Sequence, residues 1–95
     1  MSCWYTYILL CRDSSYYVGI TNDLSRRLEL HNSGQAAAWT RNRRPVRYVY
    51  TEKHAGKPEA RKREIEIKGW RREKKEALFK AGQNKGESKK NDYAG

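Results

Sequence analysis

The first twenty-one residues contain two aromatic and β-branched runs separated by a short polar segment, and this pattern restricts the fold more than any other. The run Trp4–Leu10 and the run Tyr16–Thr21 have compositions typical of strands. Residues 12–15 between them, Arg-Asp-Ser-Ser, are typical of a turn. We therefore expect residues 4–21 to form an antiparallel β-hairpin.

A helix is predicted directly after the hairpin, over residues 24–31, between a start signal at Asn22-Asp23 and a glycine-containing stop at residues 32–34. Leu24 and Leu28 lie one turn apart on this helix, so they should face the sheet. Arg27 and His31 are also one turn apart, and they occupy a neighbouring face.

The remainder of the chain predicts one more strand and two more helices. A basic loop at 35–45 precedes a strand at 46–51, in which apolar and polar residues alternate. After a break at 54–56, two helices are predicted at 58–68 and 70–80, joined at Gly69. The order ββαβαα predicts an α+β domain with a small three-stranded antiparallel sheet flanked by helices. We expect one domain over residues 1–81, followed by a disordered polar tail over 82–95.

Positive charge is concentrated in the second half of the predicted domain. The 95-residue chain has a net charge of +10. Residues 1–40 contain three basic and three acidic side chains, whereas residues 41–81 contain fifteen basic and six acidic side chains. A domain with one strongly basic half favours nucleic acid as a partner, although charge also keeps proteins soluble.

The sequence also excludes several classes of protein. No run of 18 apolar residues is present, so no segment is predicted to span a membrane. The two cysteines, without a secretion signal, favour a reducing compartment, and we expect a cytoplasmic protein. Their spacing from the two histidines does not fit a zinc finger.

Six polar or small residues are candidate site residues, although each has an ordinary structural explanation. They are Tyr7, Tyr17, Gly19, Arg27, His31 and Glu64. Tyrosine is common in paired strands, and a glutamate four residues before Lys68 commonly forms a helix ion pair. A glycine inside a strand indicates a bulge or the close approach of another group. The spacing of the whole set is more informative than any member.

The set resembles the motifs of the GIY-YIG endonuclease family. In that family two short motifs lie on the first two strands, and Tyr5-Thr6-Tyr7 and Tyr17-Val18-Gly19 occupy those positions here. An arginine on the first helix, a histidine one turn later and a glutamate on a later helix match Arg27, His31 and Glu64. The resemblance implies the GIY-YIG fold.

The resemblance covers residues 4–80 and is closest to the small stand-alone bacterial members (YhbQ-like), with likeness to the Slx-type and UvrC N-terminal nuclease domains. The first motif reads Tyr-Thr-Tyr instead of Gly-Ile-Tyr, so only its tyrosine is kept. Glu76 stands where larger members often carry an asparagine. The sequence shows no counterpart of their additional DNA-binding domain, which affects affinity and specificity more than the reaction.

The resemblance implies hydrolysis of a phosphodiester with one divalent metal ion, Mg²⁺ or Mn²⁺. Glu64 would be the metal ligand, and Arg27 would clamp a phosphate oxygen. Tyr7 would position a water molecule. The general base would be Tyr17, whose unperturbed pKa is about 10, or His31, whose unperturbed pKa of about 6.5 is better matched to neutral pH. The sequence leaves this choice open.

The basic segment would hold the DNA backbone through phosphate contacts, which carry no sequence information. The candidate nucleic-acid-binding residues are Trp39, Arg41, Arg43, Arg44, Lys68, Arg71, Arg72, Lys74 and Lys75. Trp39 would stack on an unpaired base, or it packs over the sheet edge. We expect structure-selective or non-specific DNA binding, at branched, flapped or single-stranded regions, and a link to DNA repair or recombination.

Two alternatives to a nuclease stay open on the sequence. The first is a non-enzymatic nucleic-acid-binding module on the same scaffold, which the altered first motif favours. A binder should tolerate the loss of Glu64, because a carboxylate repels phosphate, whereas a nuclease should lose activity and keep binding. The second is a subunit that docks a larger repair protein through an exposed face around Trp70 and Phe79. A nuclease could itself depend on a partner that supplies substrate choice.

Overall fold

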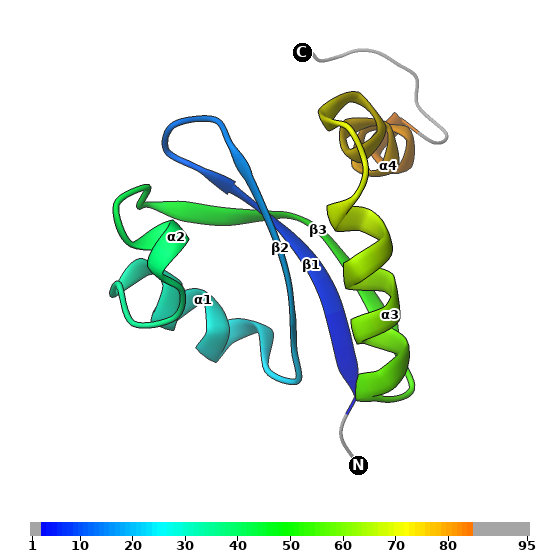
Figure 1. The fold of residues 1–95 in the computed structure, drawn as a ribbon, viewed down its shortest axis with the longest axis horizontal. Coiled ribbons are helices and arrows are strands. Elements are labelled where there is room, and N and C mark those ends of the chain that lie inside the picture. The colour runs from blue at the N-terminus through cyan, green and yellow to red at the C-terminus, as the bar shows by residue number, and fades with distance from the viewer. Residues whose placement is uncertain (1–2, 85–95) are drawn as a thin grey trace.

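The computed structural model describes residues 3–84, which form three strands and four helices (Figure 1). The strands are β1 (Trp4–Cys11), β2 (Tyr16–Thr21) and β3 (Val46–His54). The helices are α1 (Leu24–Asn32), α2 (Ala38–Arg41), α3 (Lys57–Lys68) and α4 (Arg72–Asn84). The predicted α+β fold with a three-stranded antiparallel sheet is confirmed.

The sheet has the strand order β2-β1-β3, so β1 is central and β2 is an edge strand. β1 and β2 form the predicted antiparallel hairpin, in which Tyr7 pairs with Gly19 and Leu9 with Tyr17. β1 also pairs antiparallel with β3, with one irregularity in register between Ile8 and Leu9. Because side chains alternate along a strand, this register brings Tyr7, Gly19 and Tyr17 to the same face.

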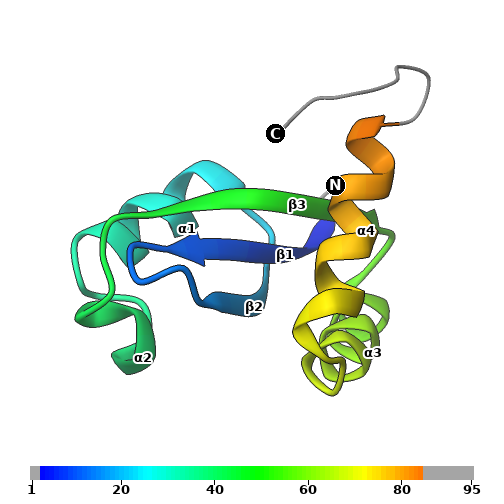
Figure 2. The same ribbon diagram turned by 90° about the horizontal axis from the view of Figure 1, so that it is seen from above.

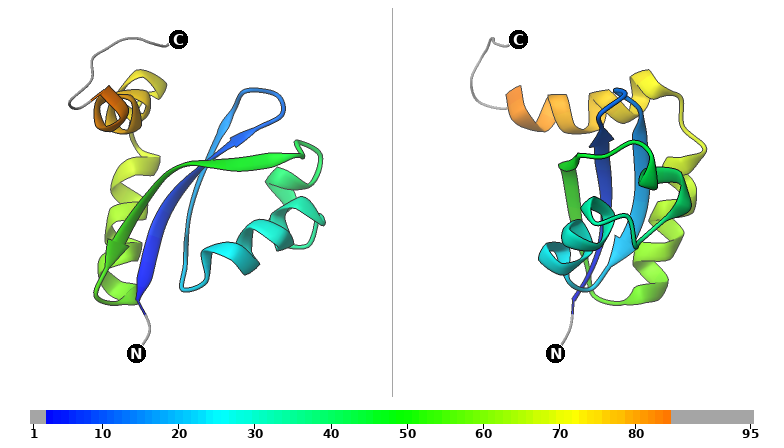
Figure 3. Two further views of the ribbon diagram at one scale, coloured as in Figure 1. Left: turned by 180° about the vertical axis from the view of Figure 1, so that it is seen from behind. Right: turned by 90° about the vertical axis from the view of Figure 1, so that its left-hand side faces the viewer.

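Each face of the sheet buries its own apolar cluster. α1 and α2 lie on one side of the sheet, and α3 and α4 lie on the other (Figure 1 and Figure 3). The buried members on the α1 side are Tyr7, Leu9, Cys11 and Val46, against which Leu24 and Leu28 pack. The buried members on the α3 side are Ile8, Val18, Ile67 and Phe79. The predicted inward orientation of the two leucines is therefore confirmed.

α1 begins and ends at the signals that the sequence contains. The Asp23 side chain accepts a hydrogen bond from the Arg26 backbone N–H at 3.1 Å, which satisfies one unpaired donor of the first turn. Beyond the other end, Gly34 has a φ of +83°, a value that glycine adopts readily. These two ends place Arg27 and His31 over the sheet.

The structure differs from the sequence-based prediction at three places. The segment expected to be a loop contains the four-residue helix α2, which is too short to show a helical period. β3 continues beyond residue 51 to His54. α4 begins at Arg72 instead of residue 70, and it includes the first three residues of the predicted tail. Residues 85–95 of that tail lie outside the described residues. No helix within residues 3–84 has the length and apolar character needed to cross a membrane.

Candidate active site

A buried chain of hydrogen bonds joins β1, α1 and α2. Tyr7 Oη lies 3.0 Å from His31 Nε2, and His31 Nδ1 lies 2.9 Å from Thr40 Oγ1. The Thr40 hydroxyl donates its one hydrogen to the carbonyl of Ala37 at 3.1 Å. It can therefore only accept from His31 Nδ1–H, which leaves Nε2 as the acceptor for the Tyr7 hydroxyl. The chain selects one tautomer of a neutral imidazole.

Burial keeps both members of the Tyr7–His31 pair uncharged. Their exposed fractions are 2% and 1%. Burial, and then the positive charge of Arg27, lower the pKa of His31 to about 4. Burial raises the pKa of Tyr7 far above its usual value, Tyr17 adds to the rise, and Arg27 opposes it. With both ring nitrogens engaged inside the protein, His31 has no nitrogen available to a solvent water molecule.

Gly19 provides the space that the Tyr7 ring occupies. A Cβ atom at Gly19 would lie 2.5 Å from Tyr7 Oη and 2.7 Å from Tyr7 Cζ. The ring cannot move aside, because it is buried and packs at 5.3 Å, centroid to centroid, against Tyr48. The close approach that the sequence predicted at this glycine is therefore the approach of the Tyr7 side chain to the backbone of β2.

Tyr17 is more exposed than Tyr7, and its hydroxyl forms no hydrogen bond within residues 3–84. Its ring packs edge-on against His31, with the centroids 5.2 Å apart. The other neighbour is Trp39, which stacks at 6.0 Å with an angle of 27° between the rings. Packing thus fixes the ring of Tyr17 while its hydroxyl is left for a ligand.

Arg27 and Glu64 each contain a buried polar atom without a hydrogen-bond partner within residues 3–84. These atoms are Arg27 Nε and Glu64 Oε1. Arg61 Nη1 approaches Glu64 Oε1 at 3.3 Å without the geometry of a hydrogen bond, and Lys68 Nζ lies 3.2 Å from Glu64 Oε2. Buried polar atoms in folded proteins nearly always have partners. His54 Nε2 is a third such atom. Arg27 and Glu64 have opposite charges, and both charges act on the pKa of Tyr7.

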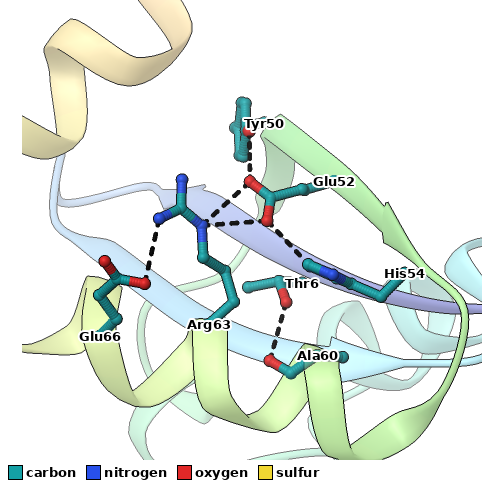
Figure 4. Close-up of polar contacts among 7 residues, drawn as sticks. All are labelled: Thr6, Tyr50, Glu52, His54, Ala60, Arg63 and Glu66. Carbon is teal, nitrogen blue, oxygen red and sulfur yellow. Dashed lines mark hydrogen bonds and ion pairs between the residues drawn. The ribbon is translucent and has the colours of Figure 1, made fainter.

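Two contacts in the residues before Glu64 fasten α3 to the sheet (Figure 4). One turn before it, the carbonyl of Ala60 accepts a hydrogen bond from Thr6 Oγ1 at 2.9 Å. Next to it, Arg63 Nε donates to the two carboxylate oxygens of Glu52 at 3.1 and 3.0 Å. The position of α3 is therefore determined by neighbours of Glu64, and the Glu64 carboxylate is available for another role.

Thr40 and the Glu52 cluster are the parts of this arrangement that sequence reasoning missed. The cluster comprises Tyr50, Glu52, His54, Arg63 and Glu66 (Figure 4). His54 Nε2 lies 2.8 Å from Glu52 Oε2, although without hydrogen-bond geometry. The alternation of polar residues in β3 was a signal for the cluster. Nothing in the sequence distinguishes Thr40 from other threonines.

A divalent ion at this site would have one protein carboxylate. Within the described part of the chain, no three His, Cys, Asp or Glu side chains gather into a group that could hold a metal. Mg²⁺ is commonly bound through one or two carboxylates and keeps several water molecules. The unpartnered Oε1 of Glu64 fits such an ion, and the nearby Arg61 and Lys68 are the cations that would compete with it.

One of the predicted binding residues around α2, Trp39, lies beside Tyr17. Trp39 is 39% exposed, and the Arg43 guanidinium carbon lies 4.0 Å from the centroid of its ring. Arg43 also forms an ion pair with Asp13 at 3.1 Å. Trp39 therefore packs against the sheet through Tyr17, as one alternative predicted, and it keeps exposed surface. Stacking on a base stays a prediction.

The other predicted binding residues lie at the end of α3, in the connection to α4 and on α4, far along the sheet from α2 (Figure 2). They are Lys68, Arg71, Arg72, Lys74 and Lys75. Arg72 pairs with Glu76 at 3.1 Å, and Glu76 also accepts a hydrogen bond from the Tyr16 hydroxyl. The structure therefore does not bring these residues together with the arginines of α2.

The exposed docking face predicted around Trp70 and Phe79 is wrong. Phe79 is buried, with 7% of its surface exposed, and it packs edge-on against Tyr16 at 5.6 Å between centroids. Trp70 is partly buried and packs against the same apolar cluster. These aromatic side chains hold α4 to the sheet.

Comparison with known protein families gives a match over most of the chain. A family model described as the GIY-YIG catalytic domain matches residues 3–77. The chain belongs to the GIY-YIG family. Membership in this family implies nuclease activity, a DNA substrate and the use of a divalent metal ion.

Small bacterial proteins are among the relatives of this GIY-YIG domain. The UPF0213 protein of Streptococcus pneumoniae serotype 4 is 44% identical over 81 residues, which cover 85% of this chain and 82% of that protein. The UPF0213 protein of Staphylococcus aureus strain Mu3 is 48% identical over 80 residues, covering 84% and 98%. The resemblance to the small stand-alone bacterial members is therefore confirmed.

Two solution NMR structures share the fold. The UPF0213 protein of Bacillus halodurans matches with a TM-score of 0.54 and 44% identity, over 83% of this chain and 84% of that chain. A protein of E. faecalis matches with a TM-score of 0.61 and 37% identity, over 95% and 96%. The relatives therefore share the three-dimensional fold of this chain as well as its sequence.

Proposed function

We propose that the protein is a metal-dependent DNA endonuclease that hydrolyses phosphodiester bonds with a single divalent ion. The observation that carries this proposal is the pair of buried, unpartnered atoms Arg27 Nε and Glu64 Oε1. Their charges act on Tyr7 from two different helices, so α1 and α3 each direct one charged group at the same strand. A bound phosphodiester would give Arg27 Nε an acceptor, and a divalent cation bound with it would give Glu64 Oε1 a partner.

Arg27 and Glu64 have complementary roles in this proposal. Arg27 stays charged at any working pH, and its planar guanidinium suits a phosphate oxygen in the charged transition state. Glu64 holds Mg²⁺ or Mn²⁺, which when bound supplies charge stabilisation for the phosphate oxygens. Removing either side chain should therefore lower the rate of cleavage more than it lowers the stability of the fold.

Tyr17 is the group that we assign to the attacking water molecule. Its hydroxyl forms no hydrogen bond within residues 3–84, whereas the Tyr7 hydroxyl bonds to His31. The low pKa of His31, about 4, and its enclosed nitrogens make it a poor acceptor for a proton from solvent. Tyr7, His31 and Thr40 are then positioning residues, because their chain of hydrogen bonds fixes the imidazole ring against which Tyr17 packs.

The substrate we propose is DNA with branched, flapped or single-stranded regions, in a repair or recombination setting. The partly exposed Trp39 beside Tyr17 supports this choice, because base–aromatic stacking requires an unpaired base. A protein partner would supply further substrate choice. Cys3 and Cys11 are free thiols, which supports a cytoplasmic location for the reaction.

A non-enzymatic DNA-binding module is the second candidate, and the ion pairs of Glu64 favour it. With Arg61 and Lys68 both within 3.3 Å, the carboxylate could serve to neutralise two neighbouring cations. In that case Glu64 would have no part in a reaction. The buried and unpartnered Oε1 favours the nuclease instead, because a purely structural carboxylate in this position would be expected to accept a hydrogen bond.

The test is incubation of the purified protein with end-labelled branched, flapped, single-stranded and duplex DNA, each with Mn²⁺, Mg²⁺ or EDTA. We expect cleavage with a divalent ion, none in EDTA, and a preference for the substrates that contain unpaired bases. Binding to the same DNAs without cleavage in either metal would overturn the proposal and leave the binding module.

A further inference from the structure

A cavity of about 530 Å³ lies at the end of the sheet where the β1–β2 turn meets α2 and the start of β3. We call it the arginine pocket, and its lining residues are Arg12, Asn32, Arg41, Asn42, Arg44 and Pro45. The elements that form it gather at the end of the sheet away from α3 and α4 (Figure 2 and Figure 3). Three guanidinium groups and two amides line it, and no carboxylate does.

The positive charge of this pocket is not neutralised by the protein. Within residues 3–84, Arg12, Arg41 and Arg44 form no ion pair, whereas the neighbouring Arg43 pairs with Asp13. Like charges around one cavity repel each other, and a bound anion relieves that repulsion.

Backbone carbonyls hold two of the guanidinium groups in place. Arg44 donates from Nε to the carbonyl of Arg41 at 2.6 Å and from Nη1 to that of Asn32 at 3.1 Å. Arg41 donates from Nε to the carbonyl of Gly34 at 3.2 Å. A guanidinium fixed in this way has further N–H donors and loses little conformational freedom when it binds a ligand.

Arg12 differs from the other two, because its side chain forms no hydrogen bond within residues 3–84. Only its backbone is engaged, through an N–H that donates to the carbonyl of Arg43 at 2.9 Å. Arg43 in turn pairs with Asp13, so the hairpin turn and the loop after α2 are joined twice. The wall of the pocket is therefore fixed, while the charged end of Arg12 is available to a ligand.

We propose that the arginine pocket binds a backbone phosphate of the DNA strand that the enzyme cleaves, away from the scissile bond. The identity of this ligand rests on the proposed function. Asn32 and Arg41 directly follow His31 and Thr40, so the pocket borders the hydrogen-bond chain of the candidate active site. An adjoining hollow of about 240 Å³ has Arg12 and Arg47 in a mostly apolar lining, so arginines continue beyond the arginine pocket, and charges spread in this way suit a polymer better than one small anion.

The test measures the affinity of the full chain for a labelled single-stranded 20-mer in EDTA, across a series of salt concentrations. Arg12→Gln removes one charge from the pocket, and Lys62→Gln removes one from the exposed side of α3 as a control. We expect Arg12→Gln to weaken binding about 3- to 10-fold and to reduce the slope of log K against log salt by about 0.7, the value for one single-strand phosphate contact. Lys62→Gln should leave the slope as in the wild type.

A second arm adds a nucleoside monophosphate as a competitor at constant ionic strength. We expect no displacement of the 20-mer at micromolar competitor. An unchanged salt slope in Arg12→Gln would overturn the proposal. Displacement of the 20-mer by micromolar competitor that is lost in Arg12→Gln would also overturn it, and would assign the pocket to a free phosphorylated ligand. Thermal unfolding of each variant verifies its fold. Because EDTA is present throughout, these results are independent of whether the protein cleaves DNA with a metal.

Discussion

Tyr7 Oη and His31 Nε2 lie 3.0 Å apart in the interior, and Thr40 binds the opposite nitrogen of the same imidazole. The orientation of the ring is therefore set by three elements of the fold before any substrate binds. Since Tyr17 packs against this ring, the chain of hydrogen bonds also determines where the partly exposed Tyr17 lies. The two tyrosines of the paired motifs thus have different tasks, which mutation can separate.

Removing the hydroxyl of Tyr7 should destabilise the protein, whereas removing that of Tyr17 should not. Tyr7→Phe leaves His31 Nε2 buried without a partner, at a cost of about 1–3 kcal/mol in the free energy of unfolding. Tyr17→Phe should change that free energy by less than about 0.5 kcal/mol and lower cleavage by about 10²–10⁴-fold. Urea unfolding and single-turnover cleavage measure the two effects. The reverse order of stabilities would contradict the assignment of these hydroxyls.

Thr40 should be needed for the tautomer of His31. Thr40→Val has nearly the same shape but cannot accept from Nδ1–H or donate to Ala37, so we expect a loss of about 1–3 kcal/mol. Thr40→Ser keeps the hydroxyl and should lose less than about 1.5 kcal/mol. The ¹⁵N chemical shifts of the imidazole report the tautomer directly. If the ¹⁵N shifts of His31 in Thr40→Val equal those of the wild type, Thr40 does not select the tautomer.

The free energy of unfolding should fall as the pH is lowered from 6.5 to 4 because of His31. Its pKa is about 4 in the folded protein and about 6.5 when unfolded, so the unfolded chain binds a proton that the folded protein excludes in this window. The stabilisation is complete above pH 6.5 and decreases by an amount on the order of 3 kcal/mol by pH 4. Urea unfolding at a series of pH values measures it.

His31→Gln is the control for this pH dependence. It removes the titrating group, so the curve between pH 6.5 and 4 should become flatter than that of the wild type, whatever the loss of stability at pH 7. The difference between the two curves isolates His31 from His54 and the carboxylates. Parallel curves would show that His31 is not buried in its neutral form.

Gly19 and Gly69 offer a matched pair of substitutions. Gly19→Ala would place a Cβ 2.5 Å from Tyr7 Oη, and we expect a loss of about 1–3 kcal/mol. At Gly69 the nearest atom would be 3.6 Å away and φ is −82°, so Gly69→Ala should be neutral or stabilising by up to about 1 kcal/mol. Thermal unfolding compares the two variants. Equal stability would mean that Tyr7 does not need the space at Gly19.

Most of the fold follows from local sequence signals. The aromatic and β-branched composition and the turn residues of the hairpin, the cap at Asp23 and the proline of α3 are each local signals of an element. The errors occur where tertiary contacts decide. β3 extends to His54, where Glu52 contacts both Arg63 and His54, and α2 lies where Thr40 bonds to His31.

The candidate site was predictable as a set of residues but not as an arrangement. Family spacing identified Tyr7, Tyr17, Arg27, His31 and Glu64. It did not indicate that His31 bonds to Tyr7 instead of Tyr17, because that choice depends on the register of β1 and β2 and on the burial of the ring. The low pKa of His31 has the same origin, since burial is a property of the packed structure.

The most direct test of the nuclease is a comparison of Glu64→Gln with Glu66→Gln. Both variants remove one carboxylate from the same turn of α3, but Glu66 is largely exposed, and within residues 3–84 its one ion-pair partner is Arg63. Cleavage and binding are measured on the same labelled DNA with Mn²⁺. The account predicts that Glu64→Gln lowers cleavage by about 10³-fold or more while DNA binding stays equal or becomes tighter, and that Glu66→Gln behaves as the wild type. Equal cleavage by Glu64→Gln and the wild type would contradict it.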